Sequence, residues 1–162
     1  MRPIRKVLFL LVLLMTPGCQ NQNMSQHTGG TWHFDGIAEI RAYRLNWDDP
    51  HAFGSIITPK GNLNSTRLPE VGIPLNKEQE GKLQAAVTGT HLSHPVAACF
   101  YPHHAFVFFD DSGKIIGHVD ICFICSNYRG SPTGFADRWD LESLEQLVLD
   151  LGMPKANEEW DG

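Results

Sequence analysis

The chain has 162 residues, of which 42% are hydrophobic and 19% charged, and its formal net charge at pH 7 is −5. From Trp32 onward it has about 130 residues, which is the length of one domain and enough to bury a core. The acidic balance argues against nucleic acid or an anionic lipid surface as a partner.

Residues 1–18 are predicted to be an export signal. Arg2, Arg5 and Lys6 form a positive start, and an uncharged apolar run of nine residues, VLFLLVLLM, follows from Val7 to Met15. This run is shorter than the ~20 residues that a membrane-spanning helix needs. Because removal of the signal also removes three positive charges, the net charge changes from −5 to −8.

The stretch LLMTPGC, which ends at Cys19, resembles a bacterial lipoprotein signal, in which cleavage occurs just before a cysteine that then carries lipid. The alternative is an ordinary secretory signal that is cut near Cys19. In Gram-negative lipoproteins, a residue such as Gln20 after the cysteine, in place of aspartate, implies the outer membrane. The resemblance therefore implies a lipid anchor on Cys19 and a domain that faces the periplasm.

The segment 19–31 is predicted to be a flexible tether, because it is polar and has almost nothing to bury. The segment 32–162 is predicted to be a single α+β domain. Its first elements are a strand at Ile37–Asn46 and a weaker strand at Ser55–Thr58. The composition of residues 62–74 predicts a loop.

Two helices are predicted. The first covers about Lys77–Val87, with Asn76 as N-cap and Gln79 completing a capping box. The second begins after Asp140, which is a typical N-cap, and it ends before Gly152 and Pro154. Its apolar residues recur at helical spacing, which predicts a face packed on a sheet: Leu141, Leu144, Leu147, Val148 and Leu151.

The centre of the domain is predicted to be a β-hairpin with strands at Ala105–Asp110 and Ile115–Phe123. Gly113 lies in the short loop between the strands and can adopt a positive φ. With a helix on either side of this region in the sequence, the predicted fold is a small, mainly antiparallel sheet packed by two helices.

The hairpin brings two cysteine-containing stretches together, CFYPHH (residues 99–104) and CFIC (residues 122–125). A three-residue loop would place Cys99 opposite Cys125, whereas a two-residue loop would place His103 opposite Cys122. Opposed residues lie ~4.5–5.5 Å apart in an antiparallel pair. In either register the two stretches are predicted to be neighbours.

Four states of this cluster are compatible with the sequence. Cys99 could form a disulfide with Cys125 or Cys122, as an oxidising compartment permits, with one thiol left free. Zinc could be held by three thiolates and an imidazole, from Cys99, His104 (or His103), Cys122 and Cys125. Cys122 and Cys125 could form a redox-active C-x-x-C pair, although no helix N-terminus activates them. Finally, the cysteines could be buried and unreactive.

His118 and Asp120 alternate with apolar residues and are therefore predicted to share one strand face. Such a pair can tune a base, but half-solvated strands commonly carry polar faces of this kind. No nucleophile motif or phosphate-binding glycine pattern occurs in the sequence. The sequence therefore assigns no reaction and no catalytic residue.

The block from Cys99 to Cys125, together with the terminal segment DLESLEQLVLDLGMP, resembles a family of bacterial proteins of uncharacterised function. The family pattern is a C-F/Y-x-P-R-H segment, a short hairpin that ends in C-F-x-C, and a final helix. His103 departs from it, because the family more often has arginine there. The resemblance implies that the cysteines and His104 act as a unit, and it implies no particular activity.

These observations predict an envelope lipoprotein whose domain is a non-enzymatic binding or structural module, with a Cys/His site at the hairpin base and zinc as its candidate cofactor. The alternatives are a thiol-redox protein or sensor that uses Cys122 and Cys125, and a disulfide-stapled envelope protein that interacts with other proteins. The predicted partner is the membrane, through the lipid on Cys19.

Overall fold

The computed structural model describes residues 29–32, 35–47, 54–92 and 94–155. The strands in this part form one sheet in the order β2-β1-β3-β4-β5, in which every neighbouring pair is antiparallel. They are β1 (Glu39–Arg44), β2 (Leu68–Pro74), β3 (His104–Phe109), β4 (Ile115–Cys122) and β5 (Asn127–Ser131).

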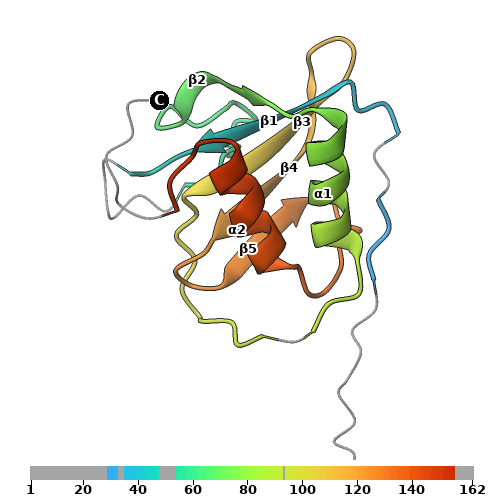
Figure 1. Ribbon diagram of the computed structural model, residues 1–162. Helices are drawn as coiled ribbons and strands as arrows, with labels where there is room; N and C mark the ends of the chain where they lie inside the picture. Colours follow the sequence, from blue (N-terminus) through green and yellow to red (C-terminus); the bar gives the residue numbers. More distant parts are fainter. Residues whose placement is uncertain (1–28, 33–34, 48–53, 93, 156–162) are drawn as a thin grey trace, which may run out of the picture.

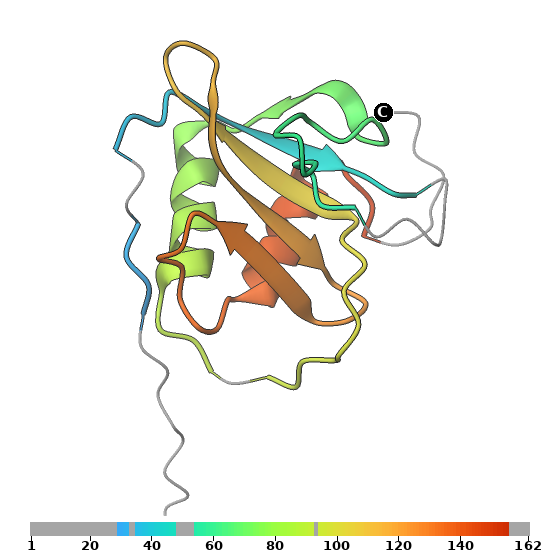
Figure 2. The same cartoon turned by 180° about the vertical axis from the view of Figure 1, so that it is seen from behind.

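Two helices, α1 (Lys77–Thr88) and α2 (Leu141–Asp150), lie side by side on the same face of the sheet (Figure 1). The main core lies between them and the sheet, and Phe106 and Phe108 of the central strand β3 are fully buried in it. A smaller core covers the other face, where the segment 54–67 crosses the sheet and buries Ile56 against Tyr43 and Val107 (Figure 2). The predicted α+β class is confirmed.

Both predicted helices are confirmed, because their signals are local in sequence. Asn76 accepts a hydrogen bond from the backbone N–H of Gln79, whose side chain accepts one from the backbone N–H of Asn76. Asp140 accepts from the backbone N–H of Ser143 at the start of α2. Of the five apolar residues that the spacing predicts for the packed face of the second helix, Leu144, Leu147 and Val148 are buried, whereas Leu141 and Leu151 are partly buried. Helix α1 buries Leu83, Ala86 and Val87.

Two predictions for the strands are wrong, and one strand is not predicted at all. Residues 68–74 form β2, which pairs with β1, although the composition of this stretch predicts a loop. Pro69 and Pro74 are tolerated there because β2 is an edge strand. The predicted strand at Ser55–Thr58 is reduced to a single bridge between Ile57 and Leu63. Strand β5 has no counterpart among the predicted elements.

The hairpin combines both predicted registers. At the turn, the backbone N–H of Asp110 donates to the carbonyl of Lys114, so the loop has three residues. An irregularity between Phe108 and Phe109 then shifts the pairing by one residue, and His104 faces Ile121. The rest of the hairpin therefore follows the register that the two-residue loop predicts.

Residues 30 and 31, which the sequence assigns to the end of the tether, are hydrogen-bonded to the domain. Gly30 donates a backbone hydrogen bond of 2.8 Å to Thr88, and Thr31 donates one of 2.7 Å to Gly134. The Trp32 ring lies edge-on against Phe108. The predicted signal, Cys19 and most of the predicted tether lie outside the described residues. Within the described residues, no helix is long and apolar enough to cross a membrane.

Candidate functional site

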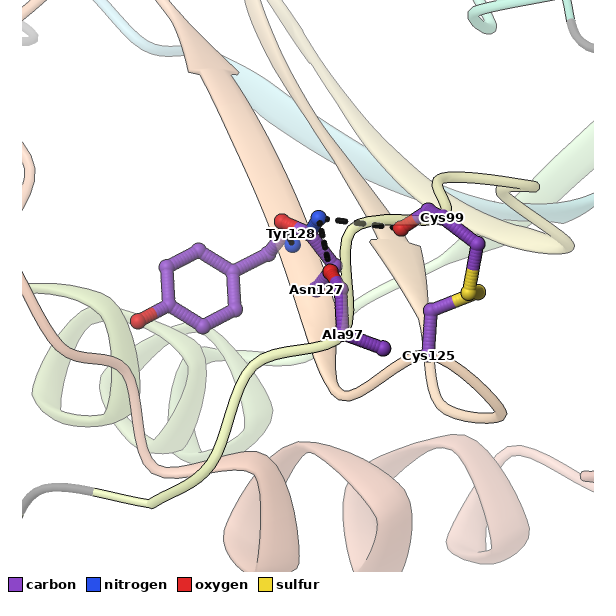
Figure 3. Close-up of a disulfide and its surroundings, with 5 residues drawn as sticks. All are labelled: Ala97, Cys99, Cys125, Asn127 and Tyr128. Carbon is purple, nitrogen blue, oxygen red and sulfur yellow. Dashed lines mark hydrogen bonds between the residues drawn. A yellow bond between two sulfur atoms is a disulfide. The ribbon is translucent and has the colours of Figure 1, made fainter.

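Cys99 and Cys125 form a disulfide at the end of the hairpin, with a Cα–Cα distance of 5.7 Å (Figure 3). Strand β4 ends at Cys122, and the chain then turns, with the backbone N–H of Ser126 donating to the carbonyl of Phe123. Cys125 therefore lies in the β4–β5 turn and not in an extended strand. The turn brings its sulfur to Cys99, although the strand register alone would place Ser126 there.

Hydrogen bonds hold the same two segments together beside the disulfide. The backbone N–H of Ala97 donates to the carbonyl of Cys125 over 3.0 Å. The side-chain amide of Asn127 donates to the carbonyls of Ala97 and Cys99, as Figure 3 shows. The disulfide thus joins two segments that are also held together by backbone and side-chain hydrogen bonds.

The other two predicted zinc ligands, His104 and Cys122, point to opposite faces of the sheet. His104 lies directly opposite Ile121 in the ladder and shares the face of the main core. Cys122 follows Ile121, so its side chain points to the other face, and it is fully buried with a free thiol. The structure therefore brings two of the four predicted ligands together, as a disulfide, and separates the other two.

No group of three or more His, Cys, Asp or Glu side chains in the described residues is arranged to hold a metal ion. Zinc at this position stays a prediction, and it requires Cys99 and Cys125 to be reduced. The predicted redox pair is also not bonded, because Cys125 pairs with Cys99 while Cys122 is a buried free thiol.

His104 is a buried, neutral histidine, 1% exposed. Its Nε2 donates a 2.9 Å hydrogen bond to the carbonyl of Pro154, just beyond α2, and its Nδ1 has no partner among the described residues. Burial lowers the pKa of His104 to about 3, and the hydrogen bond to Pro154 opposes that shift. The side chain therefore links the hairpin base to the end of α2 as an uncharged donor.

A second polar cluster lies on the opposite face of the sheet and contains Ser55, His118 and Asp120. The hydroxyl of Ser55 donates a 2.6 Å hydrogen bond to Asp120 Oδ2, and the backbone N–H of Ile56 donates a 2.9 Å bond to Asp120 Oδ1. His118 Nε2 lies 3.4 Å from Ser55 Oγ and 3.6 Å from Asp120 Oδ2. Asp120 is 1% exposed, whereas the His118 side chain remains 17% exposed.

Burial dominates the electrostatics of this cluster. It raises the pKa of Asp120, against the hydrogen bonds from Ser55 and Ile56. It also lowers the pKa of His118, against the attraction of the Asp120 carboxylate. In a catalytic triad the serine hydroxyl donates to the histidine, and the histidine donates to the aspartate. Here the Ser55 hydroxyl donates directly to the Asp120 carboxylate, so the three side chains are not arranged as a catalytic triad. The hydrogen bonds of the cluster hold Ser55 and Ile56 against the sheet.

The shared strand face of His118 and Asp120 follows from the sequence, but the contribution of Ser55 does not. Ser55 and Asp120 are 65 residues apart, and Ser55 belongs to a stretch without a regular element. No motif in the sequence connects them.

Comparisons with protein-family models, with curated proteins and with solved structures give no match for this chain.

Proposed function

We propose that this chain is an exported, lipid-anchored envelope protein whose domain is a disulfide-stapled, non-enzymatic binding or structural module. The observation that carries this proposal is the Cys99–Cys125 disulfide. Disulfides form and persist in oxidising compartments such as the bacterial periplasm. The bond is thus the state expected of a domain that follows an export signal.

The signal-like segment supports the location. Its positive start, its nine apolar residues and Cys19 together resemble a lipoprotein signal. We therefore assign the lipid anchor to Cys19 and, because Gln20 follows, place the domain at the outer membrane, facing the periplasm. The net charge of −8 that remains after signal removal supports partners other than nucleic acid.

The hydrogen bonds of His104 and of Asp120 support a non-enzymatic role. His104 uses its N–H to hold the end of α2, and Asp120 uses both carboxylate oxygens to hold residues 55 and 56. In both places, groups that could take part in catalysis instead make structural hydrogen bonds. The domain is therefore a rigid scaffold that presents its surface.

The proposal is tested on full-length protein purified from the envelope fraction. Free thiols are alkylated in denaturant without reductant, and the peptides and bound metals are then analysed by mass spectrometry. We expect one disulfide between Cys99 and Cys125, one alkylated thiol at Cys122, and a lipid on Cys19. One zinc ion per chain together with three alkylated thiols would contradict the disulfide and support the Cys/His metal site.

The anchor is tested separately with Cys19→Ser. We expect this variant to leave the membrane fraction while it keeps the Cys99–Cys125 bond. A variant that still partitions with membranes would overturn the lipid assignment and leave the disulfide unaffected.

A further inference from the structure

Three exposed apolar side chains lie in the two segments that the Cys99–Cys125 disulfide joins. Leu92 is 71% exposed, Val96 41% and Ile124 74%. Leu92 and Val96 lie in the segment between α1 and β3, Ile124 lies in the β4–β5 turn, and the disulfide joins these two segments. Both segments lie at the end of the sheet opposite the β3–β4 hairpin loop (Figures 1 and 2). We call Leu92, Val96 and Ile124 the apolar end.

The two segments that form the apolar end carry no charged residue. No Asp, Glu, Lys or Arg occurs between Leu83 and Phe109, or between Ile121 and Tyr128, although charged residues make up 19% of the chain. In the fold, Asp140 and Glu142 at the start of α2 line the same surface pocket as Leu92, so acidic residues border the apolar end on that side. The two segments themselves combine exposed aliphatic side chains with an uncharged sequence, which suits an environment that is partly apolar.

The chain that leads to Cys19 leaves the described domain close to this end. A side chain at Gly29 would contact the carbonyl of Thr88 and the hydroxyl of Thr90, two residues before Leu92. Ten residues separate Gly29 from Cys19, a length that spans at most ~36 Å when fully extended. A lipid on Cys19 therefore keeps this end of the domain near the bilayer.

We propose that the apolar end docks on the bilayer in which Cys19 is anchored, with Leu92, Val96 and Ile124 among the lipid headgroups. The proposal rests on the lipidation of Cys19 in the proposed function. Zwitterionic lipids are the surface that fits, because the mature chain is acidic and the docking segments lack Lys and Arg. Insertion of a few aliphatic side chains adds a weak second attachment to the covalent anchor.

The test uses the full lipidated protein in phosphatidylcholine vesicles, with mass spectrometry first establishing the lipid on Cys19. Hydrogen exchange is then compared with that of soluble Cys19→Ser protein. We expect exchange in residues 90–98 and 122–127 to be slower by about threefold or more on vesicles. Residues 68–74 of β2 and the second half of α2 should exchange equally in both samples.

Two pairs of substitutions separate docking from anchoring. Leu92→Glu with Ile124→Glu should abolish the slowed exchange while the protein stays bound to vesicles through its lipid. The matched control, Val71→Glu with Leu149→Glu, changes two exposed apolar residues elsewhere and should keep it.

Three results would overturn the proposal. The first is a lipidated protein whose apolar end exchanges as fast on vesicles as in solution. The second is slowed exchange that appears without vesicles and depends on protein concentration, which would show that a second copy covers this end. An unmodified Cys19 would overturn the anchor itself, and the docking with it.

Discussion

At the scale of single residues, the hydroxyl of Ser55 donates a 2.6 Å hydrogen bond to the buried Asp120 carboxylate. We predict that Ser55→Ala lowers the free energy of unfolding by about 1–3 kcal/mol, because the charged oxygen loses a donor where water has little access. Chemical denaturation at neutral pH measures this change.

Ser112→Ala is the matched control. The Ser112 hydroxyl donates a bond of 2.7 Å to Asp110, but that pair lies in the exposed hairpin turn, where water replaces the lost donor. We expect a clearly smaller loss than for Ser55→Ala. Equal losses would show that the buried cluster gives no special stabilisation.

His104 makes the stability of the domain depend on pH. Its pKa in the folded protein is about 3 because of burial, whereas an unfolded chain takes up the proton near pH 6.5. The unfolded state therefore binds the additional proton as pH falls from about 6.5 to 3. Over this range His104 lowers the free energy of unfolding by about 1.4 kcal/mol per pH unit.

We predict that His104→Gln reduces this slope by about that amount, because a glutamine amide can still donate to Pro154 but does not titrate. Denaturation series between pH 4 and 7 on both proteins give the comparison. The lowered pKa of His118 adds a slope of the same sign, which both proteins retain. Identical slopes in the two proteins would contradict a buried neutral His104.

At the scale of elements, α1 contains a glycine, Gly81, that lowers the stability of the helix. Gly81 lies within the helix, is exposed, and has nothing within 4 Å of the place where a Cβ would lie. We predict that Gly81→Ala stabilises the domain by about 0.5–1 kcal/mol, because alanine costs less conformational entropy in a helix than glycine does. Thermal or chemical denaturation measures the gain.

Gly72→Ala in β2 should have the opposite sign. Gly72 has a φ of +74°, and a Cβ there would lie 2.5 Å from the Tyr43 ring. Both the backbone conformation and the close contact require glycine at this position. If Gly72→Ala were stabilising, position 72 would not require glycine. If Gly81→Ala were destabilising, position 81 would not be an open site in a helix.

The elements that the sequence predicts are those whose signals are short in range. The Asn76 and Gln79 capping box and the leucine spacing of α2 lie within a few residues, and both helices form as predicted. Strand β2 contains Pro69 and Gly72, which disfavour a strand locally, and it forms because β1 offers an edge to pair with. Local propensity cannot indicate such a partner.

In the candidate site, too, the features that depend on short sequence distances are predictable, and the long-range contacts are not. Counting residues outward from the hairpin turn is enough to bring the Cys99 and Cys125 stretches together, and the disulfide is one of the predicted outcomes. The count cannot foresee the irregularity at Phe108 and Phe109, which decides the register. Nor can it place Ser55 on Asp120, because that contact depends on how a loop crosses the sheet.

At the scale of the whole molecule, the disulfide connects parts of the chain that the cores connect only weakly. It joins residues with a sequence separation of 26 and fixes the long segment between α1 and β3, whose described residues contribute to neither core. Closing a loop of this length in the unfolded chain corresponds to about 3–4 kcal/mol in the chain-entropy model. The stability of the domain should therefore depend on its redox state.

We predict that Cys99→Ser with Cys125→Ser, or full reduction of the native protein, lowers the free energy of unfolding by about 3 kcal/mol. Denaturation with and without dithiothreitol, with mass spectrometry to verify reduction, measures the change. Cys122→Ala is the control, because it removes the buried free thiol and leaves the disulfide, so its stability should respond to reductant as the native protein does. A fully reduced native protein with unchanged stability would show that the two cores and the hydrogen bonds around Asn127 hold this corner without the covalent bond.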